Sequence, residues 1–142
     1  MNHTPSQTRF APMERPSFQT LLQGLPVLGR SGDWTAKITG LVTDSRRILP
    51  GSLFFALPGL RSDGHEYLDD VIARGAAAVI SARPVTGLPA VAAAQVADPR
   101  KVLAEVARRF QGHPEAALQL VGVTGTNGKT TVTTLLRHLL QA

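Results

Sequence analysis

The feature that most constrains the fold of this 142-residue chain is a glycine-rich loop between an apolar segment and an amphipathic one. The loop reads Gly125-Thr126-Asn127-Gly128-Lys129-Thr130-Thr131, after the apolar segment Leu120 to Val123 and before a helical pattern that begins at about Lys129. Such a strand, turn and helix bind phosphate, because loop amides and a helix N-terminus face the anion. We expect all seven loop residues to contact a nucleotide, with Lys129 at the β- and γ-phosphates and the Thr130 hydroxyl as a Mg²⁺ ligand.

The glycine spacing of this loop departs from the general phosphate-loop pattern, which would place a glycine at position 123. The residue there is Val123, and the glycines stand instead in a shorter Gly-x-x-Gly-Lys-Thr arrangement. The alternative interpretation is a glycine-rich turn before an ordinary helix. The apolar strand, the lysine and the paired threonines together favour the phosphate loop.

Strand and helix patterns alternate between about Ser17 and Gln111. Ser17 and the pair Asp98-Pro99 are helix starts, and Gly75 is typical of a helix end. This alternation predicts an α/β domain. The expected strands are Ile38 to Val42, Leu53 to Leu57, Ala77 to Ile80 and Val91 to Val96, and the expected helices follow Ser17, run from His65 to Arg74, and follow Asp98.

We divide the chain into a disordered lead-in at 1–16, the α/β domain at 17–111, a linker at 112–118 and the start of a second domain at 119–142. The lead-in is polar and lacks the apolar region of a secretory signal. A single strand, loop and helix cannot bury both of their faces. The sequence therefore predicts that the chain ends inside a domain and is a fragment.

Composition narrows the class of partner. The absence of cysteine excludes disulfides and thiolate metal sites, and the four histidines show no metal-ligand spacing. The net charge of +5 comes with scattered arginines and only 5% aromatic residues, a pattern that favours phosphorylated small molecules over nucleic acid. No apolar run is long enough to cross a bilayer. We expect a cytoplasmic monomer without membrane insertion.

The segment Val121 to Thr131 resembles the ATP loop of the Mur ligases, a family that has this shorter glycine spacing. A second set of motifs resembles the uridine-nucleotide domain of the same family, and consists of Thr43-Asp44-Ser45-Arg46, Pro50-Gly51-Ser52-Leu53-Phe54-Phe55-Ala56, Gly59, Asp63-Gly64-His65 and Gly75-Ala76. The resemblance covers about Ile38 to Ile80 and Leu118 to Ala142. It implies an α/β fold: a small N-terminal uridine-nucleotide-binding domain, then the first strand, phosphate loop and helix of a truncated central ATP-binding domain.

The resemblance also implies an activity. The family member with the most similar loop uses ATP and Mg²⁺ to add the third peptide residue to UDP-N-acetylmuramoyl-L-alanyl-D-glutamate in peptidoglycan synthesis, through an acyl phosphate. The added free amino acid is meso-diaminopimelate or L-lysine. We expect this chain alone to be inactive. Two alternatives stay open: another ligase of the same fold, such as folylpolyglutamate synthetase, and a nucleotide-binding module without catalysis.

Residue roles follow from the same resemblance. Lys129 is the expected catalytic residue, and the UDP part of the substrate is expected to contact Thr43, Ser45, Leu60, Arg61 and Ser62. Two further pairs receive structural interpretations. Asp44 and Arg46 are expected to brace their turn, and Asp63 and His65 to act as turn and helix-cap residues.

Overall fold

The computed structural model describes residues 14–59, 63–85, 91–117 and 121–141. The chain divides after Gly112 into two compact units, which are considered separately. The predicted substrate contacts Leu60, Arg61 and Ser62 lie outside the described residues, as does Leu120 at the start of the expected second-unit strand.

The first unit contains a five-stranded sheet in the order β1-β5-β4-β3-β2. Its strands are β1 (Gly29–Ser31), β2 (Gly40–Val42), β3 (Ser52–Ala56), β4 (Ala78–Ser81) and β5 (Ala92–Gln95). Neighbours among β2 to β5 run parallel, and β1 pairs antiparallel with β5. The α/β fold class is confirmed.

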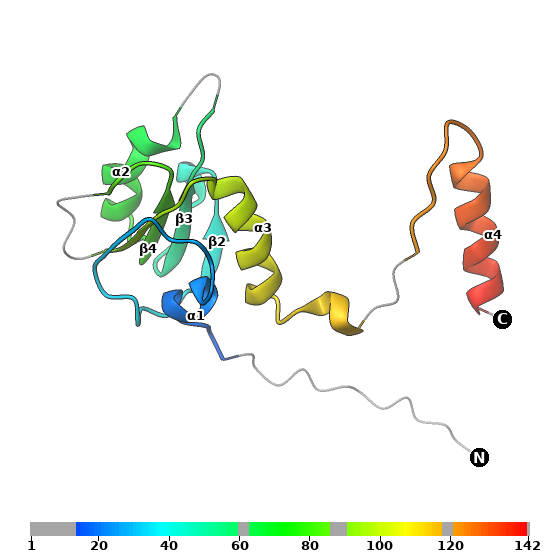
Figure 1. Ribbon diagram of the computed structural model, residues 1–142, viewed down its shortest axis with the longest axis horizontal. Coiled ribbons are helices and arrows are strands. Elements are labelled where there is room, and N and C mark those ends of the chain that lie inside the picture. Colours follow the sequence, from blue (N-terminus) through cyan, green and yellow to red (C-terminus); the bar gives the residue numbers. More distant parts are fainter. Residues whose placement is uncertain (1–13, 60–62, 86–90, 118–120, 142) are drawn as a thin grey trace, which may run out of the picture. The chain divides into compact units, whose positions relative to one another are not determined.

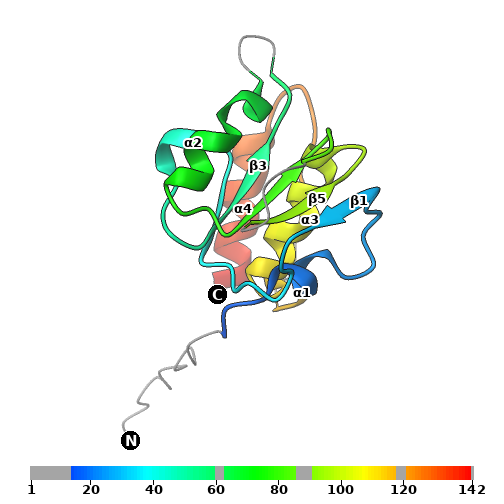
Figure 2. The same ribbon diagram turned by 90° about the vertical axis from the view of Figure 1, so that its left-hand side faces the viewer.

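Helices cover both faces of this sheet. The unit contains α1 (Phe18–Leu22), η1 (Ser45–Arg47), η2 (Gly64–Tyr67), α2 (Leu68–Ala73) and α3 (Pro99–Phe110). Figure 1 shows α2 on one side of the sheet and α3 on the other. Figure 2 turns the molecule so that the α2 side faces the viewer. Parallel sheets need this double cover, because their strands are apolar on both faces.

The central strand β3 shows how the sequence builds the two layers. All five of its residues are buried. Leu53 and Phe55 pack with α1 and α3, whereas Phe54 and Ala56 pack with α2. Alternate side chains of a strand point to opposite faces, so one apolar run supplies both cores. Burying each large apolar side chain contributes roughly 1.5–3 kcal/mol.

The helix caps expected at Ser17 and Asp98 and the helix end expected at Gly75 are confirmed. The Ser17 hydroxyl accepts a hydrogen bond from the Thr20 amide, and Asp98 caps α3 with Pro99 at its first position. Gly75 follows α2 with a φ of +93°. The expected helix from His65 begins instead as the 3₁₀ turn η2, and α2 starts only at Leu68.

Two strand predictions differ from the structure. The strand β1 was not expected, because Gly-Arg-Ser shows no apolar alternation, and its pairing with β5 alone makes it a strand. The expected strand Leu120 to Val123 is wrong over its described part, since Val121 to Val123 has no strand assignment. Strands are defined by pairing, and the described residues of the second unit offer no other strand to pair with.

The described part of the second unit holds η3 (Pro114–Ala117), the glycine-rich loop and α4 (Lys129–Gln141). The start of α4 at Lys129 agrees with the sequence pattern. Four apolar residues on this helix are between 43% and 79% exposed: Val132, Leu135, Leu139 and Leu140. Within the described ranges, no helix is both long enough and apolar enough to cross a membrane.

Candidate functional site

A cleft of about 420 Å³ opens where β2 and β3 end. Thr43 follows β2 directly and Leu57 follows β3, while Gly64 and Tyr67 come from η2. Carboxyl ends of parallel strands form the usual ligand edge of an α/β sheet. The full lining is Thr43, Asp44, Ser45, Arg46, Phe54, Leu57, Gly64 and Tyr67. The structure therefore brings Thr43 and Ser45 together in one cleft.

The turn after β2 is braced by an ion pair between Asp44 and Arg46. Arg46 donates from Nε to Asp44 Oδ1 at 2.9 Å and from Nη2 to Oδ2 at 2.7 Å. Asp44 Oδ1 also accepts from the Arg46 amide at 3.1 Å. These hydrogen bonds lower the pKa of Asp44 to about 2 and raise the pKa of Arg46. The expected brace is confirmed, and it holds a permanently charged guanidinium on the cleft lining.

A second part of the cleft lining comes from η2. Asp63 caps this turn, because its Oδ1 accepts from the His65 amide at 3.0 Å. Gly64 lies so close to β3 that a Cβ atom there would be 2.8 Å from the Leu57 nitrogen, which only glycine permits. The lining has two aromatic rings, of which Phe54 is buried and Tyr67 is 38% exposed.

The glycine-rich loop of the second unit has the backbone that a phosphate site needs. Gly125 and Gly128 have φ angles of +152° and +79°, which side-chain-bearing residues rarely adopt. The first described backbone bond of α4 runs from the Val132 amide to the Gly128 carbonyl at 3.0 Å. The amides of Lys129, Thr130 and Thr131 precede this bond, so they lack intrahelical acceptors and can bind an anion.

The side chains of this loop fit a nucleotide better than a free metal ion. The Lys129 ammonium donates to the Gly125 carbonyl within the loop. In the described part of the chain, the Thr130 hydroxyl has no hydrogen-bond partner and no group of three His, Cys, Asp or Glu side chains gathers to hold a metal. One hydroxyl suits a Mg²⁺ that arrives with phosphates, because Mg²⁺ then keeps phosphate oxygens and water as its other ligands.

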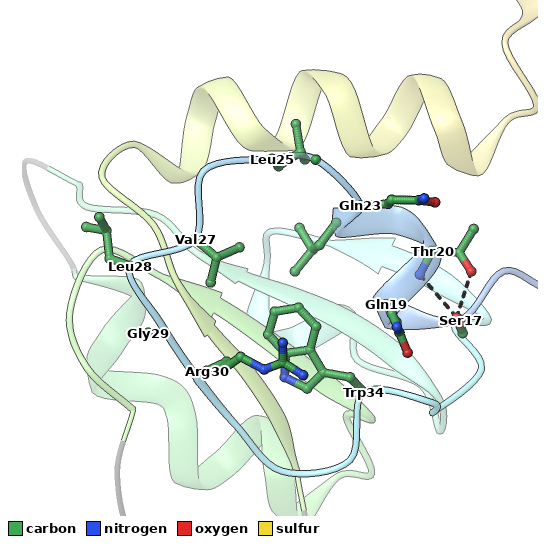
Figure 3. Close-up of a pocket in the computed structure, with 12 residues that line it drawn as sticks. Ser17, Gln19, Thr20, Gln23, Leu25, Val27, Leu28, Gly29, Arg30 and Trp34 are labelled. Atoms are coloured by element: carbon green, nitrogen blue, oxygen red, sulfur yellow. Dashed lines mark hydrogen bonds between the residues drawn. The ribbon is translucent and has the colours of Figure 1, made fainter.

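A separate cavity of about 590 Å³ lies beside α1 (Figure 3). The guanidinium of Arg30 stacks over the Trp34 ring at 4.6 Å, and the indole N–H donates to the Ser31 carbonyl at 3.1 Å. The ring of Trp34 also packs on Phe18 with a centroid distance of 4.9 Å. These contacts tie the segment before β2 to the core.

Sequence reasoning left two cleft residues without a binding role. Arg46 was interpreted only as a brace, and Tyr67 only as part of the expected helix from His65 to Arg74. Their positions in the chain relative to the strands could have indicated a binding role. Arg46 follows the end of β2, and Tyr67 lies in the connection that follows β3, so parallel pairing places both at one edge of the sheet.

The parallel sheet with helices on both faces, the cleft at its strand ends and the glycine-rich loop later in the chain define an α/β protein with two candidate ligand sites. The model of the Mur ligase family catalytic domain matches residues 37–111, which is more than half of the chain. The chain belongs to the Mur ligase family.

Individual members of the family match a large part of this chain. A UDP-N-acetylmuramoyl-L-alanyl-D-glutamate–2,6-diaminopimelate ligase of Solibacter usitatus is 49% identical over 106 residues, which are 75% of this chain and 22% of the relative. The Acinetobacter baumannii UDP-N-acetylmuramoylalanyl-D-glutamyl-2,6-diaminopimelate–D-alanyl-D-alanyl ligase structure has a TM-score of 0.63 at 29% identity, over 93% of this chain and 29% of that one.

A further solved relative is the MurF ligase of Thermotoga maritima in complex with ADP. It has a TM-score of 0.53 and 31% identity, over 71% of this chain and 23% of that one. The chain spans about a fifth to a quarter of the length of the curated relatives that it matches.

Proposed function

We propose that this chain supplies the uridine-nucleotide unit and the ATP loop of a ligase that adds diaminopimelate to UDP-N-acetylmuramoyl-L-alanyl-D-glutamate. The observation that carries the proposal is the cleft where Thr43, Ser45 and Arg46 lie together, followed in the chain by the Gly125–Thr131 loop. Curated relatives named for this reaction match 85% and 84% of this chain.

The cleft suits a uridine diphosphate. The hydroxyls of Thr43 and Ser45 offer donors and acceptors to the polar edges of a pyrimidine or a ribose. The Arg46 guanidinium keeps donors beyond those that bind Asp44, and these are available to a phosphate. The Tyr67 ring offers a flat apolar surface on which a base can stack. We extend the site to Leu60, Arg61 and Ser62 on the family resemblance alone.

In the proposed reaction, the substrate carboxylate attacks the γ-phosphorus of ATP, and ADP leaves. The amine of the incoming amino acid then attacks the resulting acyl phosphate, forms the amide and releases phosphate. The loop lowers the barrier by holding the transferred group and neutralising its charge. Lys129 supplies one positive charge, and the amides at the start of α4 supply hydrogen bonds.

A Mg²⁺ ion bound with ATP would neutralise further phosphate charge, and the Thr130 hydroxyl is the residue of this chain that we assign to it. Gly125, Thr126, Asn127, Gly128 and Thr131 form the rest of the proposed ATP loop. The amino-acid substrate has no proposed contact among the described residues. We also propose that residues 17–111 form the uridine-nucleotide domain, that the protein is a monomer and that it is located in the cytoplasm.

Nucleotide titration of the 142-residue chain, followed by NMR, tests the assignment of the two sites. UDP is expected to shift the amide resonances of Thr43, Ser45, Arg46 and Gly64. ADP with Mg²⁺ is expected to leave these resonances unchanged. Equal shifts from both nucleotides, or none from UDP, would remove the uridine site from this cleft. Binding of both nucleotides without any ligase activity in a complete enzyme would favour a non-catalytic module.

A further inference from the structure

The connection between β3 and η2 is closed at its base by a short contact. The Gly64 amide donates to the Leu57 carbonyl at 3.0 Å, and the missing side chain of Gly64 allows this approach. Both residues line the cleft. We refer to Leu57 and Gly64 together as the cleft stem. Any shift of the stem therefore changes the lining of the cleft.

A network from the end of β4 holds this stem. Arg83 Nη2 lies 2.6 Å from Asp63 Oδ2, and the Arg83 amide donates to the Ser81 hydroxyl at 3.1 Å. The same hydroxyl lies 3.0 Å from His65 Nδ1. Ser81 is 1% exposed, so it is a fixed point in the core from which the network reaches both residues that flank Gly64.

Asp63 is the link between this network and the stem. One of its oxygens caps η2 at the His65 amide, and the other pairs with Arg83. The Asp63 side chain is 22% exposed, whereas Arg83 is 62% exposed and therefore free of the core. None of Asp63, His65, Ser81 and Arg83 lines the cleft. The Arg83–Asp63 ion pair and the Ser81–His65 contact each hold one neighbour of Gly64.

We propose that Asp63 and Arg83 are positioning residues for the uridine nucleotide, an inference that rests on the function proposed above. They fix the cleft stem before the ligand arrives, so that binding does not have to order it. A wall that is already ordered raises affinity, because less conformational entropy is lost on binding. An exposed ion pair alone changes an equilibrium by at most about fivefold. Here the pair acts through a capping carboxylate and a buried hydroxyl.

The substitutions separate charge from capping. Asp63→Asn keeps an oxygen that caps η2 and removes the ion pair, because asparagine is as good a helix cap as aspartate. Arg83→Ala removes the pair from the other side, and Arg83→Lys restores a positive charge. The matched control is Arg74→Ala. Arg74 is similarly exposed and pairs with Asp70 at 3.0 Å on α2, but neither residue lines the cleft or flanks Gly64.

Calorimetric titration of the 142-residue chain with UDP tests the proposal, with thermal unfolding measured on each variant. We expect Arg83→Ala and Asp63→Asn each to weaken UDP binding by about fivefold, and the double variant to bind no more weakly than either single one. Arg83→Lys is expected to recover most of the affinity, and Arg74→Ala to bind like the wild type. The unfolding midpoint of Arg83→Ala is expected to match that of Arg74→Ala.

Two results would overturn the positioning role while leaving the proposed function in place. One is wild-type affinity in both single variants, and the other is additive losses in the double variant. Failure of the wild-type chain to bind UDP would instead overturn the uridine site, and the positioning role with it. The amides of Leu57 and Gly64 in the ligand-free chain give a second readout. We expect them to shift in Arg83→Ala and Asp63→Asn but not in Arg74→Ala.

Discussion

The ammonium group of Lys129 donates a hydrogen bond to the carbonyl oxygen of Gly125, at the beginning of the same glycine-rich loop. The lysine is thus folded back onto its own loop. A phosphate held by the loop amides is a stronger acceptor than a neutral carbonyl, because the hydrogen bond is then charged on both sides. We infer that Lys129 exchanges the Gly125 carbonyl for phosphate oxygens when a nucleotide binds.

The first prediction concerns this lysine. A chimeric ligase, in which the matching amino-terminal segment of the Solibacter usitatus relative is replaced by this chain, provides a complete enzyme for the test. Lys129→Ala is expected to lower the turnover of the chimera by about a hundredfold or more. The variant lacks the positive charge of the lysine that stabilises the transferred phosphoryl group. Phosphate release measures turnover. Lys101→Ala, an exposed lysine on α3, is the control, and UDP-substrate affinity is expected to stay unchanged in both variants.

The second prediction concerns α4. Its apolar residues Leu135, Leu139 and Leu140 are 59% to 79% exposed, whereas β3 is buried along its whole length. A helix without packing on its apolar face is marginal in water. Hydrogen exchange on the 142-residue chain is expected to be much faster at the amides from Val132 to Leu140 than at those of β3. Similar protection in the two segments would show that α4 is covered in solution.

The third prediction concerns the junction of α1 and α3. The Arg109 Nη1 atom donates to the carbonyls of Leu21 at 3.1 Å and Gln23 at 2.6 Å, where α1 ends, and its Nε donates to Glu105. Arg109→Ala leaves these carbonyls without their charged donor and is expected to destabilise the chain by about 1–3 kcal/mol. The stability of Arg109→Lys is expected to lie between those of the wild type and Arg109→Ala. Lysine keeps the charge but lacks the planar guanidinium that donates several hydrogen bonds at once.

Urea unfolding of these variants measures the loss. Arg74→Ala serves as the control, since it removes an arginine from an exposed ion pair within one helix. A loss in Arg109→Ala no larger than in Arg74→Ala would mean that the contacts to the end of α1 add nothing to stability.

The fourth prediction concerns pH. The hydrogen bonds from Arg108 and Arg109 lower the pKa of Glu105 from 4.5 to about 2 in the folded chain. A lowered pKa stabilises the fold above the unfolded-state value, and this stabilisation is lost as pH falls through the folded-state value. The unfolding midpoint is therefore expected to fall as pH drops from about 4.5 towards 2. Glu105→Gln is expected to flatten this dependence, and an unchanged slope in that variant would contradict the assignment.

Local chemistry made the first unit largely predictable. Ser17, Asp98 and Pro99 set helix starts through caps that depend only on neighbouring residues. The apolar run from Leu53 to Leu57 indicated a strand, and β3 lies there. By contrast, β1 depends on its pairing with β5, which lies more than sixty residues later in the chain. The residues Gly29 to Ser31 alone do not predict this pairing.

The cleft was predictable only in part for the same reason. Thr43 and Ser45 were assigned through family resemblance, and parallel pairing of β2 and β3 brings them to one edge of the sheet. Tyr67 belongs to the 3₁₀ turn η2, which the helical pattern of the sequence did not indicate. The ion pair between Asp63 and Arg83 joins residues on either side of α2, so it becomes visible only in the folded unit.

Turnover by the chimeric ligase tests the central claim most directly. The purified enzyme would be supplied with ATP, Mg²⁺, UDP-N-acetylmuramoyl-L-alanyl-D-glutamate and diaminopimelate, and the peptide product measured by mass. We predict formation of the UDP-linked tripeptide with one ADP released per amide bond, and none when the dipeptide substrate is withheld. A folded chimera that binds ATP yet makes no tripeptide, while the parent ligase does, would contradict the account.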